Sequence, residues 1–227
     1  MLAQTLFAPD RDTGLGPDLG RLAAILVWRL VRGDSPRPTR EISNTHRLKM
    51  SENSLKPNAK LTSWVDSRLE TRLSPINGSG LFARVPIQAG EVLVVWGGTV
   101  YTRADLLAGK ANLETIAVLD ADLYLADPLD ALLADEYPLN HSCDPNAWMR
   151  DAITLIARQS IVADEEVTAD YALWLFEQEW KLDPCLCGSS LCRGRVTDRD
   201  WKLPDLQNRY AGHFTPYLNR LIKNLST

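Results

Sequence analysis

The residues best suited to chemistry in this 227-residue chain are its four cysteines. Three of them form a tight C-x-C-x4-C pattern, "CLCGSSLC", and the fourth lies within the stretch "LNHSCDPN". Thiolates at this spacing converge readily on one tetrahedral ion of the Zn²⁺ type, with Zn–S distances of about 2.3 Å. Three ligands leave one position open, which the remaining cysteine can fill. The pattern predicts a structural zinc site formed by Cys143, Cys185, Cys187 and Cys192.

Two other interpretations of the cysteines stay open at this point. In one, Cys143 is a small buried residue, and water or a histidine completes the metal site. In the other, the thiols form a redox or zinc-sensing centre. The C-x-C spacing disfavours the second, because thiol oxidoreductases use C-x-x-C at a helix start. A reducing compartment also makes a disulfide framework unlikely for so few cysteines.

The composition is that of an ordinary globular protein, and its charge narrows the class of partner. The net charge of −4 and pI near 5.4 give no overall basic field for nucleic acid, but suit a basic protein or peptide. The longest apolar run, Leu22–Leu30, is too short to cross a bilayer, which needs about 20 residues. Asp10 and Asp12 precede it, unlike a signal peptide. We expect an intracellular protein, cytoplasmic or, in a eukaryote, nuclear, with no membrane span and no direct nucleic-acid binding.

The elements that must position the cysteines are mainly short strands. Residues 103–135 are rich in Leu and Ala and are expected to be helical or mixed. Many short strands with few long helices indicate a β-rich α+β fold. Apolar and β-branched runs bounded by Gly and Pro predict strands at Leu81–Arg84, Val92–Trp96, Ala147–Arg150, Thr154–Ala157 and Glu166–Ala169.

The two ends of the chain differ from its middle. Residues 1–60 read as an N-terminal extension, with a short amphipathic helix across 19–30 and a probable disordered linker across 33–60. At the other end, Thr215 can cap a helix whose first residue is Pro216. One face of that helix is expected to pack on the domain through Leu218, Leu221, Ile222 and Leu225.

Four segments in chain order resemble the SET-domain protein lysine methyltransferases. They are "GSGLF" with "AGE" (78–82 and 89–91), "NHSCDPN" (140–146), "IVADEEVTADY" (161–171) and "CLCGSSLCRG" (185–194). The resemblance implies a SET-domain fold of short strands with a knot-like active site, a post-SET zinc loop and a helical C-terminal tail. The domains would be 61–180 for the SET domain, 181–196 for the post-SET zinc motif and 197–227 for the tail.

The resemblance also implies a role for particular residues. Tyr171 would be the catalytic phenol, and Leu186 would cover the adenine of the cofactor S-adenosylmethionine. Ala169 lies where the family often has Phe or Tyr, which leaves room for di- or trimethylation. Other cofactor contacts would come from Gly78, Gly80, Leu81, Asn140 and His141. The candidate aromatics of a lysine channel are Trp148, Trp174 and Phe176, for which the alternative interpretation is a place in the core.

The expected activity is therefore that of a protein-lysine N-methyltransferase. The methyl group of S-adenosylmethionine would pass in line to the neutral amine of a lysine in a basic protein, with Zn²⁺ in a structural role. The alternative is a catalytically silent SET fold that acts as a zinc-stabilised binding module. Two departures from the family pattern are Tyr137-Pro138-Leu139 before "NHSC", where Arg-Phe-Ile is common, and Asp164 in place of a glycine.

Overall fold

Short strands connected by turns make up most of the described chain. The computed structural model describes residues 56–131, 138–176 and 179–225. The strands are β1 (Lys60–Leu61), β2 (Trp64–Val65), β3 (Leu69–Leu73), β4 (Ser79–Ala83), β5 (Val92–Val95), β6 (Gly98–Thr102), β7 (Ala117–Asp120), β8 (Leu123–Ala126), β9 (Asn140–His141), β10 (Ala147–Met149), β11 (Thr154–Ala157), β12 (Glu166–Ala169), β13 (Lys181–Leu182) and β14 (Val196–Thr197). The helices are α2 (Arg103–Leu107), α3 (Pro204–Arg209) and α4 (Pro216–Leu225), with 3-10 turns η2 (Leu113–Thr115), η3 (Tyr171–Leu173) and η4 (Asp200–Lys202).

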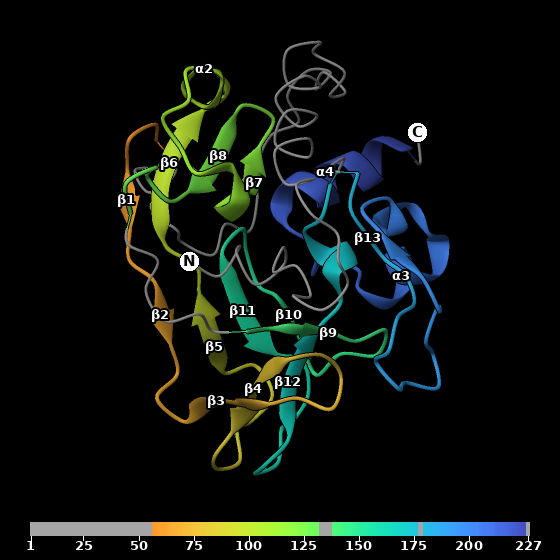
Figure 1. Cartoon of the computed structure of the whole chain (residues 1–227). Coiled ribbons are helices and arrows are strands. Elements are labelled where there is room, and N and C mark those ends of the chain that lie inside the picture. The colour runs from red at the N-terminus through yellow and green to blue at the C-terminus, as the bar shows by residue number, and fades with distance from the viewer. Residues whose placement is uncertain (1–55, 132–137, 177–178, 226–227) are drawn as a thin grey trace.

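The strands form three sheets (Figure 1). The largest follows the order β2-β5-β11-β10-β12-β4-β3, and β9 pairs with β12 beside it. A second sheet has the order β1-β6-β8-β7, and β13 pairs with β14 in the third. The second sheet, with α2, lies at one end of the molecule, and the helices of the C-terminal region lie to one side (Figure 1).

Most expected strands form where the sequence predicts them. β11 and β12 have the predicted bounds, and β4, β5 and β10 end one residue before theirs. Residues 103–135 differ: only α2 and η2 are helical among the described residues there, and β7 and β8 form an antiparallel hairpin. Pairing of β8 with β6 explains the difference, because cross-strand contacts override the modest helix preference of Leu and Ala.

The C-terminal helix packs on the domain, as expected. Tyr217, Leu218 and Leu221 are buried in the same core cluster as the strands of the largest sheet. α4 begins at Pro216 and contacts β7 (Figure 1). Leu225 does not join the packed face, since it is 61% exposed at the last turn of the helix.

The N-terminal expectations are mostly outside the described residues. The helix expected across 19–30 and the linker up to residue 55 fall there. Lys60, expected to end the linker, instead belongs to β1, where it pairs with Thr99 of β6. None of the helices in the described ranges is long and apolar enough to span a membrane.

Candidate functional site

Two segments far apart in the sequence meet at the centre of the site. β9 and β12 pair in parallel, with Thr168 opposite Asn140 and Ala169 opposite His141. β10 also pairs in parallel with β12. The segment 140–149 is therefore joined to β12 at both of its ends, through β9 and through β10. This pairing brings the "NHSC" and "TADY" stretches side by side.

Asn140 holds the turn before β4 in place. Its Nδ2 donates to the backbone oxygens of Asn77 at 3.2 Å and Ser79 at 3.0 Å, and to Oε1 of Glu166 at 2.7 Å. The other carboxylate oxygen of Glu166 accepts from Ser74 Oγ at 2.8 Å. We call this set, Ser74–Leu81 with Asn140 and Glu166, the cradle. The sequence motifs did not single out Ser74 or Glu166 as site residues.

Gly80 leaves room for the carboxylate of Glu166 in the cradle. A Cβ built at this position would lie 2.0 Å from Oε1 of Glu166, closer than any side chain tolerates. Gly78 has a φ of +49°, in the left-handed region that glycine adopts without strain. Leu81 is fully buried and pairs with Thr71 on one side and Val167 on the other, so its backbone lies within the sheet.

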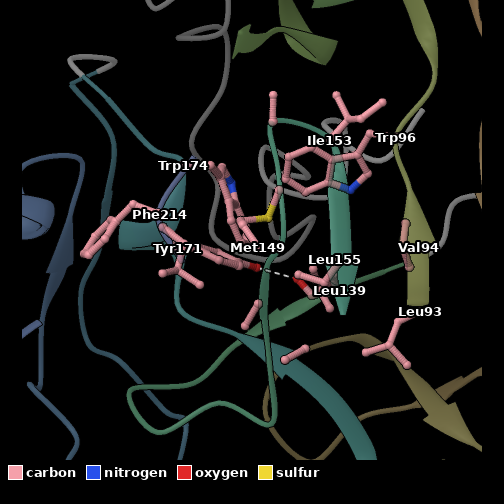
Figure 2. Close-up of a cluster of buried hydrophobic side chains, with 14 of the residues drawn as sticks. Leu93, Val94, Trp96, Leu139, Met149, Ile153, Leu155, Tyr171, Trp174 and Phe214 are labelled. Carbon is pink, nitrogen blue, oxygen red and sulfur yellow. Dashed lines mark hydrogen bonds between the residues drawn. The ribbon is translucent and has the colours of Figure 1, made fainter. Parts of the chain in front are cut away.

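Tyr171 lies two residues after the end of β12 and starts η3. Asp170 caps this turn, because its Oδ1 accepts from the N–H of Ala172 at 3.1 Å. The Tyr171 hydroxyl donates to the backbone oxygen of Leu139 at 2.7 Å (Figure 2). Burial raises the pKa of this phenol above its usual value, so at pH 7 it is a neutral hydrogen-bonding group.

Aromatic rings surround Tyr171. The rings of Trp174 and Trp180 lie 5.5 and 5.4 Å from the Tyr171 ring, measured between centroids. Trp96 meets Trp174 edge-on at 5.2 Å, and Met149 lies among them (Figure 2). The sequence singled out Trp174 but not Trp96 or Trp180. The sequence offered one weak signal for Trp96, which is that this tryptophan directly follows a strand, β5.

The other expected channel residues have different surroundings. Trp148 alternates with Met149 along β10 and stacks on His213, with 3.5 Å between ring centroids. The structure therefore does not bring Trp148 to Tyr171. Phe176 contacts the rings of Trp201 and Tyr217 instead. Ala169 is fully buried in β12, two residues before the phenol.

The metal-binding side chains converge, but not quite as the sequence predicts. Ligand atoms of His141, Cys143, Cys185 and Cys187 all lie within 4.8 Å of one another. A tetrahedral ion with Zn–S distances of about 2.3 Å needs ligand atoms roughly 3.8 Å apart, so this donor set suits a zinc ion. Cys192 is not in that group of four, although it packs against the cluster. Leu186 of the same loop is 65% exposed.

The thiols differ in how readily they ionise. Burial raises the pKa of Cys143, and raises that of Cys185 to about 11. Burial opposes ionisation of Cys187 as well, but hydrogen bonds from the backbone at Cys143 and Ser189 hold its pKa at about 7. Several thiolates this close together repel one another, so a divalent cation between them would favour the ionised cluster.

The hydrogen bonds of His141 define its tautomer. Its Nδ1 accepts from the N–H of Tyr171 at 3.3 Å, and its Nε2 lies 3.2 Å from Sγ of Cys143. Burial lowers the pKa of His141 to about 4, so the ring is neutral at pH 7. Because Nδ1 accepts a hydrogen bond, the single ring proton is on Nε2 and points at the sulfur. In this tautomer Nε2 of His141 donates to the sulfur of Cys143 and has no free lone pair for a metal.

Arg193 connects the cysteine loop, residues 183–195 between β13 and β14, to Tyr171. The sequence motifs included Arg193 but did not single it out. Its guanidinium donates to both carboxylate oxygens of Asp170, at 2.7 and 2.9 Å, and to Asp200 at 2.9 Å. Its backbone N–H donates to Sγ of Cys143 at 3.3 Å. Burial disfavours the charged guanidinium, but the bonds to Asp170 outweigh it and raise the pKa of Arg193.

Comparison with known proteins finds similarity over the central part of the chain. Residues 78–172 match the model of the SET domain. The chain is 27% identical over 147 residues to histone-lysine N-methyltransferase ATX2 of Arabidopsis thaliana, covering 59% of this chain and 13% of that protein. It is 30% identical over 141 residues to histone-lysine N-methyltransferase SETD1 of Drosophila melanogaster, covering 57% and 8%.

The solved structures include one of KRYPTONITE in complex with mCHG DNA and SAH. That structure is 25% identical, with a TM-score of 0.42, over 59% of this chain and 30% of that one. The chain spans only a small fraction of the length of the two curated relatives described above.

Proposed function

We propose that this chain, whose residues 78–172 match the SET-domain model, transfers a methyl group from S-adenosylmethionine to a lysine side chain of a protein. One observation carries the proposal: the parallel pairing of β9 with β12. That pairing unites the cradle around Asn140 with the strand that leads directly into Tyr171. The names of the two relatives described above add support, since each is called a histone-lysine N-methyltransferase.

The chemistry needs alignment and a neutral amine. When bound, S-adenosylmethionine supplies an electrophilic methyl group on a positively charged sulfur. Displacement at that methyl is in line, so holding donor and acceptor in line dominates the catalysis. A free lysine has a pKa near 10.4, and deprotonating it at pH 7 costs roughly 4–5 kcal/mol at 1.36 kcal/mol per unit.

Tyr171 and its neighbours suit this requirement. Apolar aromatic surroundings lower the pKa of a lysine amine, because burial disfavours its charged form. The rings of Trp174 and Trp180 beside the phenol supply such surroundings. A neutral Tyr171 hydroxyl can accept a hydrogen bond from the amine and orient its lone pair without acting as a strong base.

The residues of the cradle would hold the cofactor. The backbone at Gly78 and Gly80, the amide of Asn140 and the segment at His141 lie together beside β12. We retain Leu81 for its backbone alone, since its side chain is in the core. Leu186 is exposed on the cysteine loop and would cover the adenine.

We further propose that a structural zinc is held by four thiolates. Cys143, Cys185 and Cys187 converge, and the tautomer of His141 leaves Cys192 as the fourth ligand. Cobalt substitution tests this assignment, because the intensity of the thiolate-to-cobalt charge-transfer band grows with the number of thiolates. We expect Cys192→Ser to reduce that band and His141→Gln to preserve it. The opposite pattern would make His141 the ligand.

The substrate class is a lysine in a basic protein. The net charge of −4 suits such a partner. A small residue, Ala169, precedes the phenol by two positions and would leave room for an amine that already carries methyl groups. We therefore expect di- or trimethylated product under exhaustive conditions. Mass spectra showing monomethyl-lysine alone would contradict this part of the proposal.

The deciding experiment compares Tyr171→Phe with wild type. Labelled S-adenosylmethionine is incubated with the purified full chain and a cell lysate, and the labelled proteins are identified. We expect Tyr171→Phe to lose methyl transfer by about 100-fold or more, with cofactor affinity, measured by calorimetry, retained. Tyr124→Phe is the matched control, since its hydroxyl contacts Ala121 in the second sheet. If wild type also transfers no methyl group, the chain is a zinc-stabilised binding module instead.

A further inference from the structure

Arg193 lies where the cysteine loop meets the rest of the domain. It follows Cys192 directly, and its side chain is 15% exposed. The Asp170 side chain that it pairs with is fully buried. The backbone and the side chain of Arg193 reach in different directions: the N–H meets Cys143 and the guanidinium meets Asp170. One residue therefore contacts both a metal-binding thiol and the residue next to Tyr171.

Asp170 links its contact with Arg193 to the position of Tyr171. Its Oδ1 caps η3 through the N–H of Ala172, so the carboxylate determines where the turn that carries Tyr171 begins. Its Oδ2 also accepts from the hydroxyl of Tyr210 at 3.2 Å. Of the groups that contact this carboxylate, Arg193 is the one that carries a full positive charge. Burying a carboxylate this deeply costs free energy that a paired cation offsets.

A second connection runs through His141. Its Nδ1 accepts from the N–H of Tyr171, and its Nε2 lies against the same sulfur of Cys143. Cys143, Arg193, Asp170, Tyr171 and His141 thus form a closed ring of contacts. One route from the sulfur of Cys143 to Tyr171 runs through His141, and the other runs through Arg193 and Asp170. Only the second route includes a residue of the cysteine loop.

We propose that Arg193 is a positioning residue: it makes the placement of Tyr171 depend on the folding of the cysteine loop onto the domain. This rests on the proposed function, in which Tyr171 orients the amine and the loop holds zinc. With the loop seated, Arg193 clamps Asp170 and η3 is fixed. With the loop released, Asp170 loses its counter-ion, and the phenol loses its alignment.

The geometry also explains why arginine suits this position. The planar guanidinium donates to both oxygens of Asp170 and, through Nε, to Asp200 at once. Asp200 in turn accepts from the hydroxyl of Thr197 at 2.7 Å, which fixes the end of the loop. A lysine could satisfy one carboxylate but could not span both in this fork geometry. Arg193→Lys should therefore restore part of what Arg193→Gln loses.

The test compares Arg193→Gln with Arg195→Gln in the full chain. Arg195 lies two residues further along the same loop, and its ion pair with Asp183 is exposed and long, at 3.7 Å. Zinc content is measured by mass spectrometry of metals, cofactor affinity by calorimetry, and backbone order by hydrogen exchange of the peptide spanning 168–175. Methyl transfer is measured as kcat and KM separately.

We expect Arg193→Gln to keep one zinc per chain and to bind S-adenosylmethionine as wild type does. Its exchange across 170–173 should rise, and kcat should fall about 100-fold, as for a reacting group misplaced by about 1 Å. Arg193→Lys should recover part of kcat, while Arg195→Gln should stay within about twofold of wild type, as for an exposed ion pair. Arg193 and Asp170 share one interaction. The double variant Arg193→Gln with Asp170→Asn should therefore lose little more kcat than either single variant.

Three outcomes would overturn the proposal. One is exchange across 170–173 that is unchanged in Arg193→Gln. Another is loss of zinc from this variant, which would make Arg193 part of the metal site. The third is a kcat equal to that of Arg195→Gln. Exchange and zinc content report on Arg193 even if wild type transfers no methyl group, so failure of the proposed function would be seen separately.

Discussion

The cradle and the cysteine loop contact the same short segment, 140–143, but they are held in different ways. β3 and β4 pair over five residues, and β4 pairs again with β12, so the cradle rests on continuous strand ladders. The cysteine loop lies between β13 and β14, which are two residues each. Its attachments are side chains and sulfur atoms, chiefly Cys143 and Arg193.

This difference indicates how each region responds to change. Backbone ladders spread their stabilisation over many weak bonds, so no single one is essential. The loop depends on a few strong interactions, each of which involves charge in a partly buried place. We therefore expect changes in the loop to have large effects and changes in the cradle to have local ones.

Removing the metal should give the largest effect. A structural zinc contributes about 10–16 kcal/mol to folding in small zinc domains. Cys185→Ser should therefore lose the ion, and hydrogen exchange should rise throughout 181–197 while β3 and β4 stay protected. Ser190→Ala, an exposed change in the same loop, is the control. Protection of the loop that survives loss of zinc would show that the loop does not depend on the metal.

Breaking the ion pair between loop and domain should come next. Asp170→Asn removes the fully buried partner of Arg193 and leaves only its ion pair with Asp200, and breaking a buried ion pair typically costs about 3–5 kcal/mol. Urea unfolding followed by circular dichroism measures the change in the free energy of unfolding. Asp183→Asn removes the exposed pair with Arg195 and should cost less than about 1 kcal/mol. Equal costs for the two variants would remove the distinction between buried and exposed pairs.

A change in the cradle should be smaller and confined to the cofactor site. In Gly80→Ala the new Cβ displaces the carboxylate of Glu166, which breaks its bonds to Asn140 and Ser74. Two such hydrogen bonds contribute about 1–3 kcal/mol together. We expect weaker binding of S-adenosylmethionine by calorimetry, with zinc content unchanged. Glu166→Ala in the same chain removes the clash and should recover part of the stability. Affinity equal to wild type in Gly80→Ala would place the cofactor elsewhere.

Acid should have the smallest effect on the cradle side. The side-chain hydrogen bonds from Arg68 hold the pKa of Asp66 below its usual value of 3.8. A carboxylate whose pKa is lowered by folding stabilises the protein above the unfolded pKa, and that stabilisation is lost as pH falls below about 4. Asp66→Asn should therefore cost about 1 kcal/mol at pH 7 and less at pH 3. Urea unfolding at both pH values checks this, and a cost that grows on acidification would contradict it.

Much of the fold could be predicted because its signals are local. Thr154–Ala157 and Glu166–Ala169 are rich in β-branched and apolar residues and became β11 and β12 at those bounds. The hairpin of β7 and β8 could not be predicted in the same way. Apart from Val118 and Tyr124 its residues are Ala, Leu and Asp, which favour other structures, and they become strands because β6 is available for pairing.

The candidate site divides in the same manner. Spacing predicted a converging cysteine cluster, and the structure brings Cys143 to Cys185 and Cys187. It did not predict that His141 enters that cluster or that Cys192 lies beside it. Nor did it predict that Trp148 turns away from Tyr171. Along β10 the side chains alternate between faces, so Met149 lies near the rings around Tyr171 while Trp148 stacks on His213 (Figure 2).

The sequence by itself determined which chemical groups are present and the order in which they occur: four thiols, a phenol after "TAD", and the glycines at positions 78 and 80. The tertiary structure decided which of them are partners. Arg193 meets Asp170 across 23 residues, and Tyr171 meets Leu139 across 32. Such pairs form because burial leaves each polar group with few possible partners, and a local pattern in the sequence carries no information about which partner folding will bring.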